Sequence, residues 1–411
     1  MLKVGFIGSG FVADFHRQAL LGVRDVELAG LVRRGRSEEL AAKARADGLG
    51  PVVIYDSVGE LCEAVDVIAV LAPNFTRVES FEQILAARQK GAELKGLICE
   101  KPLARNVAEA DKILTISDQI GVPVAYFENN LFIPPIVKAR EQLKSVEATM
   151  GPAHLTRTAE EHAGPFVTYW FWDPTLQGGG VWNDMGCHSI AVGMHMLTPY
   201  GKPQDYLQPV SVNAELALLK WGKQPWLGHL KEQGIPFDEK PAEDYANVSI
   251  KMRDPESGRI GMVQAANSWM FDSSGLRLSM ETFGPGYSYT CDSLQSPGEV
   301  FVGDKASATI EDQFAAVENA QSTRGRLVLQ PNEPDLYGYV GEWRSAMAAF
   351  ERGENALLDL RYGRLITLLT MAGYLSHETR RVVDLQDEQT VKQLETYIPL
   401  IQQGKGAEVL L

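Results

Sequence analysis

The sequence predicts an α/β protein with two sheets, one parallel and one mostly antiparallel. An apolar strand at the start of the chain runs directly into a glycine-rich turn and a helix. Short apolar strands and helices then alternate as far as about residue 131, as they do in a doubly wound parallel sheet. After about Pro134 strands dominate, and several alternate apolar with polar residues, which is typical of an antiparallel sheet with one packed face.

The first strand, residues 3–7, is followed by Gly8-Ser9-Gly10-Phe11-Val12-Ala13. This run fits the Gly-x-Gly-x-x-Gly/Ala fingerprint of a dinucleotide-binding Rossmann unit. Gly8 permits the tight turn, Gly10 lets the backbone approach a pyrophosphate, and Ala13 lets the helix pack close to the strand. The helix expected over residues 12–21 directs its N-terminal amides at the phosphates. We therefore expect a dinucleotide site formed by Gly8, Gly10, Phe11, Val12 and Ala13.

Arginines stand where the ribose of the cofactor would lie. The second apolar strand, residues 26–32, ends on Arg33, Arg34 and Arg36, where an NAD-specific site usually places an acid on the ribose 2′-hydroxyl. Guanidinium groups form charge-assisted hydrogen bonds with a 2′-phosphate. The run therefore predicts NADP, with NAD as the alternative if the arginines form only a solvated turn or stack on the adenine.

The other elements of the first domain follow in regular order. Ser57 is placed to cap the helix that leads to Ala64. Because the carboxyl ends of parallel strands meet at one rim, we expect Asn74, Lys101 and residues 128–130 on the same rim. The predicted helices cover residues 38–46, 78–91 and 108–120, and the predicted strands cover residues 51–55, 65–71, 94–100 and 123–127.

In the second domain, a helix over residues 135–143 precedes a region dominated by strands. The predicted strands cover residues 153–158, 210–219, 245–252, 261–269, 277–282 and 287–291. Residues 220–240 have no clear period and are predicted to form an insertion loop. Helices are expected again over residues 337–352 and 360–379, joined by an extended link.

Length and composition fit two domains, residues 1–131 and residues 132–411, with the last helices able to pack back on the first domain. The net charge of −14 argues against nucleic acid or an anionic membrane as the main partner. The four cysteines are widely separated, as reduced thiols usually are. A strand that begins at Leu2 leaves no room for a signal peptide, and no apolar run approaches a membrane span, so we expect a cytoplasmic protein.

Two constellations carry chemistry. Glu100-Lys101-Pro102 ends a buried strand, and the Lys101 ammonium could lower the cost of charge on a substrate oxygen, or act as an acid/base if its pKa is depressed. The alternative is that Lys101 is a solvated loop lysine without a catalytic role. In the run that begins at Gln177, Asp184 and His188 are four residues apart on an expected helix, so the carboxylate could orient the imidazole as a base. The pair could also be half of a metal site, but no further cluster completes one, so we expect no metal.

Together these marks resemble the glucose-fructose oxidoreductase / inositol dehydrogenase / MocA (Gfo/Idh/MocA) family over nearly the whole chain. The matching marks are the fingerprint, Ala72-Pro73-Asn74, Glu100-Lys101-Pro102, and the glycine run leading to Asp184-x-x-x-His188. The resemblance implies that Lys101, Asp184 and His188 are catalytic and that Asn74 contacts the nicotinamide side of the cofactor. It also implies a C-terminal α/β domain with a large open sheet and a homo-oligomer, a dimer or a tetramer. The cofactor contacts expected on the rim are Ala72, Pro73, Asn74, Glu100 and Lys101.

The chain also departs from the family. Arg77 stands where members often have His, and Leu131 stands where many have Arg, so we expect a substrate other than a simple inositol. Aromatic residues before the glycine run suit the apolar faces of a sugar, although a core or interface cluster is the alternative. These are Phe166, Tyr169, Trp170, Phe171 and Trp172. The expected substrate contacts are Lys101, Asn129, His162, Tyr169, Trp172, Asp184 and His188.

Three functions fit these residues. The first is an NAD(P)-dependent oxidoreductase acting on a hydroxyl or keto group of a sugar, glycoside or polyol, in which Asp184 fixes the ring of His188. The second, which the resemblance allows, is a redox-neutral glycoside hydrolase with tightly bound cofactor; Glu160, Glu161 and His162 are its extra acid/base candidates. The third is a non-catalytic dinucleotide sensor, which has no need of an intact catalytic set.

Overall fold

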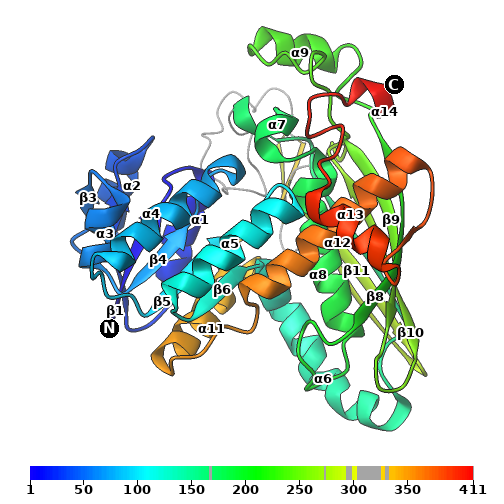
Figure 1. Ribbon diagram of the computed structural model, residues 1–411, viewed down its shortest axis with the longest axis horizontal. Coiled ribbons are helices and arrows are strands. Elements are labelled where there is room, and N and C mark those ends of the chain that lie inside the picture. Colours follow the sequence, from blue (N-terminus) through cyan, green and yellow to red (C-terminus); the bar gives the residue numbers. More distant parts are fainter. Residues whose placement is uncertain (166–168, 273–274, 293–298, 303–324, 329–332, 411) are drawn as a thin grey trace.

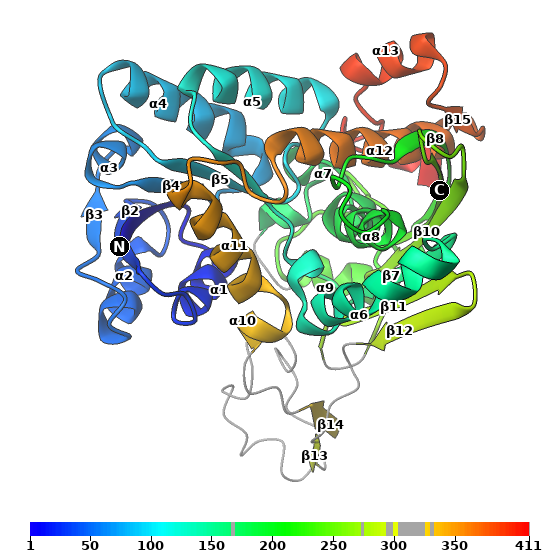
Figure 2. The ribbon, with the colours of Figure 1, turned by 90° about the horizontal axis from the view of Figure 1, so that it is seen from below.

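The computed structural model describes residues 1–165, 169–272, 275–292, 299–302, 325–328 and 333–410 (Figure 1). Phe166, one of the aromatic residues predicted to face a sugar, lies outside this part of the chain. Two sheets account for the architecture, and a helical layer of α5, α8 and α12 lies between and beside them (Figures 1 and 2).

The N-terminal sheet is the predicted doubly wound parallel sheet. Its six strands run in the order β3-β2-β1-β4-β5-β6, the strand order of a dinucleotide-binding fold. The strands are β1 (Leu2–Ile7), β2 (Val26–Val32), β3 (Val53–Tyr55), β4 (Val67–Val70), β5 (Gly96–Glu100) and β6 (Val124–Phe127). The helices between them are α1 (Phe11–Leu20), α2 (Ser37–Ala46), α3 (Val58–Ala64), α4 (Arg77–Gln89) and α5 (Val107–Ile120), with the short 3₁₀ turns Asn74–Thr76 and Asn129–Phe132 after β4 and β6.

Local chemistry explains where these elements begin and turn. The Ser57 hydroxyl accepts the amide of Glu60 at 3.2 Å, which confirms the predicted cap of α3. Gly8 has a φ of +127°, and a Cβ there would lie 2.7 Å from the carbonyl carbon of Leu71 at the end of β4. Only glycine fits both the conformation and the contact.

The C-terminal sheet has seven strands in the order β12-β11-β7-β10-β9-β8-β15, and every pair is antiparallel except β7 with β10. One face is packed against α8 (Val181–Leu197) and α12 (Leu360–Thr379), so the predicted mostly antiparallel sheet is confirmed. The strands are β7 (Leu155–Glu161), β8 (Gln208–Ala217), β9 (Tyr245–Arg253), β10 (Ile260–Ser268), β11 (Arg277–Gly284), β12 (Tyr287–Asp292) and β15 (Val383–Asp384). A separate pair, β13 (Glu299–Val302) and β14 (Gly325–Val328), lies apart from this sheet (Figure 2).

A late part of the chain returns to the first sheet. The helix α11 (Tyr339–Glu351) follows α10 (Glu333–Leu336) and lies beside α1 (Figure 2). Its Trp343 is fully buried, stacks on Phe6 with ring centroids 6.0 Å apart, and meets Phe127 edge-on at 5.0 Å. The core of the N-terminal sheet therefore includes residues from more than three hundred positions later in the chain.

The structure differs from the sequence prediction in several segments. The segment at residues 220–240, predicted as a loop, contains the helix α9 (Trp226–Glu232). Leu230 and Phe237 are buried in the apolar core, although the sequence around them has no helical periodicity. The helix predicted over residues 135–143 is α6 and continues to Met150 (Pro134–Met150). Four further helices and turns complete the described chain: Tyr169–Phe171, α7 (Pro174–Gln177), α13 (Glu388–Thr396) and α14 (Ala407–Leu410). None of the helices in the described segments is both long enough and apolar enough to cross a membrane.

Candidate active site

The glycine-rich turn leaves space where a pyrophosphate would lie. Gly10 begins α1 without a side-chain cap, and a Cβ on Gly10 would meet no atom within 4 Å. The first amides of α1 are therefore open to an anion, as a dinucleotide phosphate requires. The Ser9 hydroxyl donates to the carbonyl of Arg34 at 2.5 Å and ties this turn to the arginine loop.

The three arginines are not equally available to a cofactor. Arg33 pairs with Asp56 at 2.6 Å and with Glu38 at 2.7 Å. Arg36 pairs with Glu39 at 2.5 Å. Arg34 is exposed, and it alone of the three has no acidic partner in the described part of the chain. The predicted contact of Arg33 with a 2′-phosphate must therefore compete with two carboxylates, whereas Arg34 is free to make it.

The loop that carries Lys101 is held by a buried arginine. Arg77 donates to the carbonyls of Ala72 at 3.3 Å, Glu100 at 2.5 Å and Lys101 at 2.8 Å. This contact joins the ends of β4 and β5, the two strands beside which the nicotinamide would lie. The sequence marked Arg77 only as a departure from the family. Its contacts with carbonyls after β4 and at the end of β5, 5 and 23 to 24 residues away, give it this structural role.

Asn74, a predicted cofactor contact, faces the second domain. Its side-chain amide donates to the carbonyl of Gln177 at 2.6 Å, and the amide of Asn183 donates to the same oxygen at 3.0 Å. Asn74 therefore joins the rim of the parallel sheet to the start of α8. Glu100, also predicted at the cofactor, accepts from His16 Nε2 at 3.0 Å, and His16 Nδ1 accepts the indole N–H of Trp343 at 2.9 Å.

Lys101 lies against Asp184, as their predicted common site requires. Its ammonium is 3.3 Å from Asp184 Oδ1 and 3.0 Å from the carbonyl of the same residue. Burial disfavours the charge on Lys101, but the nearby Asp184 outweighs it and raises the pKa of Lys101 above its ordinary value. The ammonium form is therefore the one present near neutral pH. Of the two roles that the sequence left open for Lys101, this favours electrostatic stabilisation over proton transfer.

Asp184 has two further partners. Its Oδ2 accepts the indole N–H of Trp269 at 3.3 Å and lies 3.6 Å from His162 Nε2. His162 Nδ1 accepts the amide of Gly164 at 3.0 Å, so in the neutral ring the proton is on Nε2, on the side of Asp184. Burial opposes ionisation of Asp184, but Lys101 and His162 outweigh it and lower its pKa to about 2. Asp184 is a permanent carboxylate.

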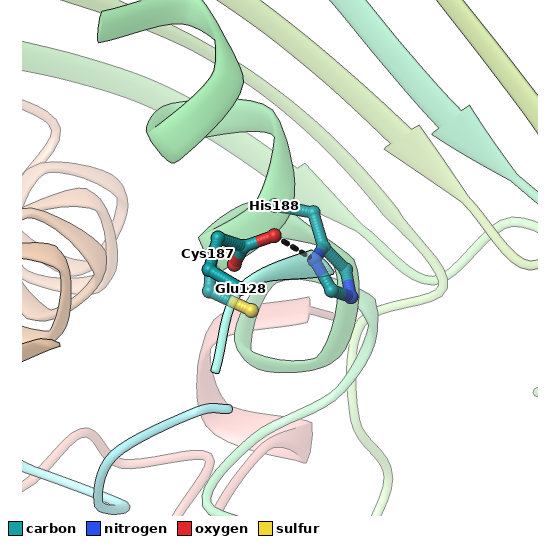
Figure 3. Close-up of side chains that lie close together, drawn as sticks. All are labelled: Glu128, Cys187 and His188. Carbon is teal, nitrogen blue, oxygen red and sulfur yellow. Dashed lines mark hydrogen bonds and ion pairs between the residues drawn. The ribbon is translucent and has the colours of Figure 1, made fainter. Parts of the chain in front are cut away.

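His188 is oriented by Glu128 and not by Asp184. The predicted pairing within the helix is wrong, because His188 Nδ1 hydrogen-bonds the fully buried carboxylate of Glu128, which follows β6 (Figure 3). The other ring nitrogen faces away from that carboxylate (Figure 3). Burial lowers the pKa of His188, but Glu128 and Glu160 outweigh it and raise the pKa above its ordinary value. The sequence placed residue 128 on the rim of the sheet, but no local pattern could have indicated that Glu128 pairs with His188, 60 residues later.

Cys187 completes a group of three ligand-type residues. One ligand atom each of Glu128, Cys187 and His188 lies within 4.8 Å of the others. Burial raises the pKa of the Cys187 thiol well above its ordinary value, and the thiol donates to the carbonyl of Asp184 at 3.2 Å. Metal ligation needs a thiolate and a free imidazole nitrogen, whereas this thiol stays protonated and Nδ1 is engaged by Glu128. The expectation of no metal stays a prediction.

A second buried acid lies beside His188. Burial raises the pKa of Glu160, against the opposing effect of His188 and Lys101. Its carboxyl accepts the side-chain amide of Asn130 at 3.2 Å. The next residue, Glu161, points to the other side of β7 and binds Ser268 and Arg277, both at 2.9 Å. Of the three extra acid/base candidates, Glu160 and His162 are therefore brought to the site, and Glu161 is not.

The remaining predicted substrate contacts differ in availability. The side-chain amide of Asn129 donates to the side-chain oxygen of Asn130 at 3.0 Å and to the carbonyl of Tyr337 at 2.7 Å, so this amide is engaged within the protein. Trp172 is only 5% exposed and packs against Trp221, Phe237 and Trp269, which is a packing role and leaves little surface for a sugar. Tyr169 is 51% exposed and remains free to contact a ligand.

Comparison with known proteins agrees with the predicted dinucleotide-binding domain. The family model described as "Oxidoreductase family, NAD-binding Rossmann fold" (GFO_IDH_MocA) matches residues 2–127. Residues 2–127 therefore match the NAD-binding domain of the Gfo/Idh/MocA family. Among curated relatives, D-glucoside 3-dehydrogenase of Escherichia coli (strain K12) is 26% identical over 391 residues, 93% of this chain and 97% of the relative. Myo-inositol 2-dehydrogenase of Thermotoga maritima is 28% identical over 390 residues, 94% of this chain and 99% of the relative.

Solved structures agree in fold. GenD2 from gentamicin A biosynthesis, in complex with NAD, has a TM-score of 0.72 and 23% identity, and the match covers 93% of this chain and 96% of that one. In the present structure the residues of the site fall into two groups: Lys101 with Asp184 and His162, and His188 with Glu128. The first holds a fixed positive charge, and the second holds a titratable base.

Proposed function

We propose that the protein is an NAD(P)-dependent dehydrogenase that transfers a hydride between the nicotinamide and a hydroxyl-bearing carbon of a sugar, glycoside or polyol. The observation that carries the proposal is the meeting of the Lys101–Asp184 pair and the His188–Glu128 pair beyond the carboxyl ends of β5 and β6. That is where ligands of open α/β sheets bind. The relatives named above, a glucoside dehydrogenase and an inositol dehydrogenase, support this substrate class.

The residues of the first domain fit a dinucleotide. Gly8, Gly10 and the first amides of α1 would hold its pyrophosphate, and the ends of β4 and β5 would flank its nicotinamide. When bound, the cofactor supplies the hydride acceptor or donor. We propose NADP as the preferred cofactor, with NAD as the alternative, because Arg34 has no acidic partner among the described residues.

His188 acts as the base in the oxidative direction. Its Nδ1 is held by Glu128, so the unbound Nε2 is left to accept the proton of a substrate hydroxyl. The Glu128 carboxylate then stabilises the imidazolium that forms. In the reductive direction the same imidazolium returns the proton to the alkoxide.

Lys101 stabilises the negative charge that develops on the substrate oxygen. Its ammonium is fixed by both an oxygen of the Asp184 carboxylate and the Asp184 carbonyl, so little reorganisation is needed when the charge forms. Because its pKa is raised, Lys101 holds its proton throughout. It therefore contributes as a fixed charge and His188 as the group that moves a proton.

Single substitutions of these two residues test the proposal. Lys101→Ala and His188→Ala should each lower kcat by roughly 10²- to 10⁴-fold on the true sugar or glycoside. Titration of the cofactor should give an affinity close to that of the wild type, because the hydrogen bonds of both side chains are to residues outside the fingerprint turn. Lys223→Ala, at an exposed lysine, is the control. Near-normal turnover in both variants would show that the roles are misassigned.

Glu160 favours a second candidate, redox-neutral cleavage of a glycoside. Because burial raises its pKa, the Glu160 carboxyl holds a proton up to a higher pH than an ordinary glutamate, and in its protonated form it could donate to a leaving group after a neighbouring hydroxyl has been oxidised. Elimination, addition of water and re-reduction would then regenerate the cofactor. The two candidates separate in one assay that follows cofactor absorbance and sugar products together. Glycoside cleavage without accumulating reduced cofactor would favour the second, and one reduced cofactor per sugar oxidised would exclude it.

A further inference from the structure

Glu243 is a buried acid that the mechanism above does not use. It is fully buried and lies between α9 and β9, and the amides that its side chain contacts at the start of α8 are 61 and 63 residues earlier in the chain. Its Oε1 accepts three hydrogen bonds: from the amide of Gly180 at 2.9 Å, from the amide of Trp182 at 3.0 Å, and from the hydroxyl of Tyr374 at 2.6 Å. Its backbone carbonyl accepts the amide of Val181 at 3.0 Å.

These contacts replace a cap at the start of α8, the helix that carries Asp184 and His188. Gly180 stands at the N-cap position and has no side chain to satisfy the first amides. Glu243 binds three successive amides there, at residues 180, 181 and 182, and its negative charge suits the positive end of the helix dipole. The first turn of α8 is therefore fixed by a residue from another part of the fold.

The glycine run is shaped to admit these partners. A Cβ on Gly179 would lie 1.9 Å from the hydroxyl oxygen of Tyr374, and a Cβ on Gly180 would lie 2.1 Å from the carbonyl oxygen of Glu243. The run that marks the family motif in the sequence is thus a packing surface for Glu243 and Tyr374. Any side chain there would push α8 away from both.

The residue after Glu243 holds the other side of Asp184. The Asp244 carboxylate accepts the amides of Leu219, Lys220 and Trp221 at 2.7 to 2.8 Å, and its carbonyl accepts the amide of Trp269 at 2.9 Å. Trp269 in turn donates its indole N–H to Asp184 at 3.3 Å. The dipeptide Glu243-Asp244 therefore reaches Asp184 twice, through the backbone of α8 and through the ring of Trp269.

We propose that Glu243 is a positioning residue, which sets the place of Asp184 and His188 by fixing the first turn of α8. The proposal rests on the function proposed above, in which His188 moves the substrate proton and Asp184 holds Lys101 in place. Displacement of this turn would move Asp184 away from Lys101 and His188 away from Glu128. Misplacements of about 1 Å at a catalytic group can cost of the order of a hundredfold in rate.

The pKa of Glu243 lies close to neutral pH. Burial raises its pKa to about 7, although Tyr374 and the amides of Trp182 and Gly180 favour the ionised form. The groups that face it are the Tyr374 hydroxyl from α12 and the amides of α8, and none of its hydrogen-bond partners in the described chain is a cation. Glu243→Gln, which keeps an acceptor for the same donors, is therefore the conservative variant.

The test compares Glu243→Ala, Glu243→Gln and Tyr374→Phe, with the exposed Glu239→Ala as the matched control. Hydrogen exchange at residues 180–184 reports the first turn of α8 without any substrate. We expect Glu243→Ala to speed exchange there by roughly tenfold or more and to lower kcat by roughly tenfold to a hundredfold, with a smaller change in KM. The acidic limb of its pH profile should move toward the ordinary value of a histidine, and Glu243→Gln should restore most of the rate.

Each outcome decides the matter. A folded Glu243→Ala protein with wild-type exchange and wild-type kcat overturns the proposal, as does one that loses thermal stability but keeps kcat per folded molecule. If Glu243→Ala does not fold, Tyr374→Phe removes a single hydrogen bond and should give a several-fold loss of kcat with faster exchange; no change in either overturns the proposal. If wild-type protein oxidises no sugar, the proposed function fails, and unchanged exchange in Glu243→Ala would then separately remove the positioning role.

Discussion

At the scale of single residues, His188 owes its proton affinity to the carboxyl groups around it. Burial alone would lower its pKa, and Glu128 and Glu160 more than reverse that effect. The neutral ring is the base for oxidation of a hydroxyl. The oxidative rate should therefore rise with pH as His188 loses its proton, at a pKa above the ordinary value, and the reductive rate should fall over the same range.

Glu128→Gln tests this account. Loss of the carboxylate removes the main stabilisation of the imidazolium, so the acidic limb of kcat/KM for oxidation should move to lower pH. The rate on the plateau should fall by of the order of tenfold to a thousandfold, because the ring is less well oriented. Glu161→Gln is the control, since that carboxylate binds Ser268 and Arg277 on the other side of β7. Identical pH profiles for Glu128→Gln and wild type would contradict the role given to Glu128.

Cofactor choice is also decided by single residues. Arg34→Ala should weaken NADP binding by about 1.5–3 kcal/mol, roughly ten- to a hundredfold, and affect NAD less, because one charge-assisted contact is lost. Calorimetric titration with both cofactors measures this. Arg36→Ala should change the affinity for either cofactor little, because Arg36 is already paired with Glu39. Equal losses for both cofactors would mean that Arg34 only stacks on the adenine, and tighter binding of NAD by wild type would refute the preference for NADP.

At the scale of elements, glycines set how closely the helices approach their partners. α8 lies against α12 through Trp182, whose ring would collide with a Cβ on Gly186 or on Gly373 and whose indole N–H donates to the carbonyl of Thr370 at 3.0 Å. Gly180 brings the start of α8 onto Glu243. The turn before α1 is different, because the space beside Gly10 is empty of protein.

Two alanine substitutions separate these roles. Gly180→Ala should lower the free energy of unfolding by about 1–3 kcal/mol, because the new methyl group meets backbone that cannot move cheaply. Gly10→Ala should leave stability near that of wild type and weaken cofactor binding, since its methyl group would occupy the approach of the pyrophosphate. Denaturant titration and cofactor titration of both variants check the pair. A stable Gly180→Ala protein, or wild-type cofactor affinity in Gly10→Ala, would contradict the respective assignment.

At the scale of the whole molecule, the two ends of the chain share one core. Trp343 of α11 packs on Phe6 and Phe127 and donates to His16, which in turn donates to Glu100 beside Lys101. The late helix therefore supports the loop that carries the proposed catalytic lysine. Stability of the first sheet and order of the site should depend on each other.

Trp343→Ala should reduce the free energy of unfolding by about 3–5 kcal/mol, the usual cost of removing a fully buried aromatic ring. Urea denaturation followed by circular dichroism measures the loss. The partly exposed Trp226→Ala should cost less than about 1 kcal/mol. Similar losses for the two tryptophans would argue against a shared core between α11 and the parallel sheet.

Elements with strong local signals were predictable. The strand β2 and the helix α12 have the predicted bounds, because apolar runs, periodicity and caps are local. The helix α9 was not predicted, because it depends on the burial of Leu230 and Phe237 against residues distant in sequence. Lys101, Asp184 and His188 were recognisable as motif residues. The roles of Glu128, Arg77 and Glu243 were not, because each of these residues binds a segment distant in sequence.

The sequence by itself determined the two-sheet plan, the dinucleotide turn and the residue types that can move a proton or hold a charge. Tertiary structure alone decided which of these groups meet. Asp184 and His188 share a helix face, yet Asp184 pairs with Lys101 and His188 pairs with Glu128. The spacing of two residues along a helix fixes only their direction relative to each other. Which partner each side chain finds depends on the strands and loops packed against that helix, and these come from parts of the chain about 60 to 85 residues away.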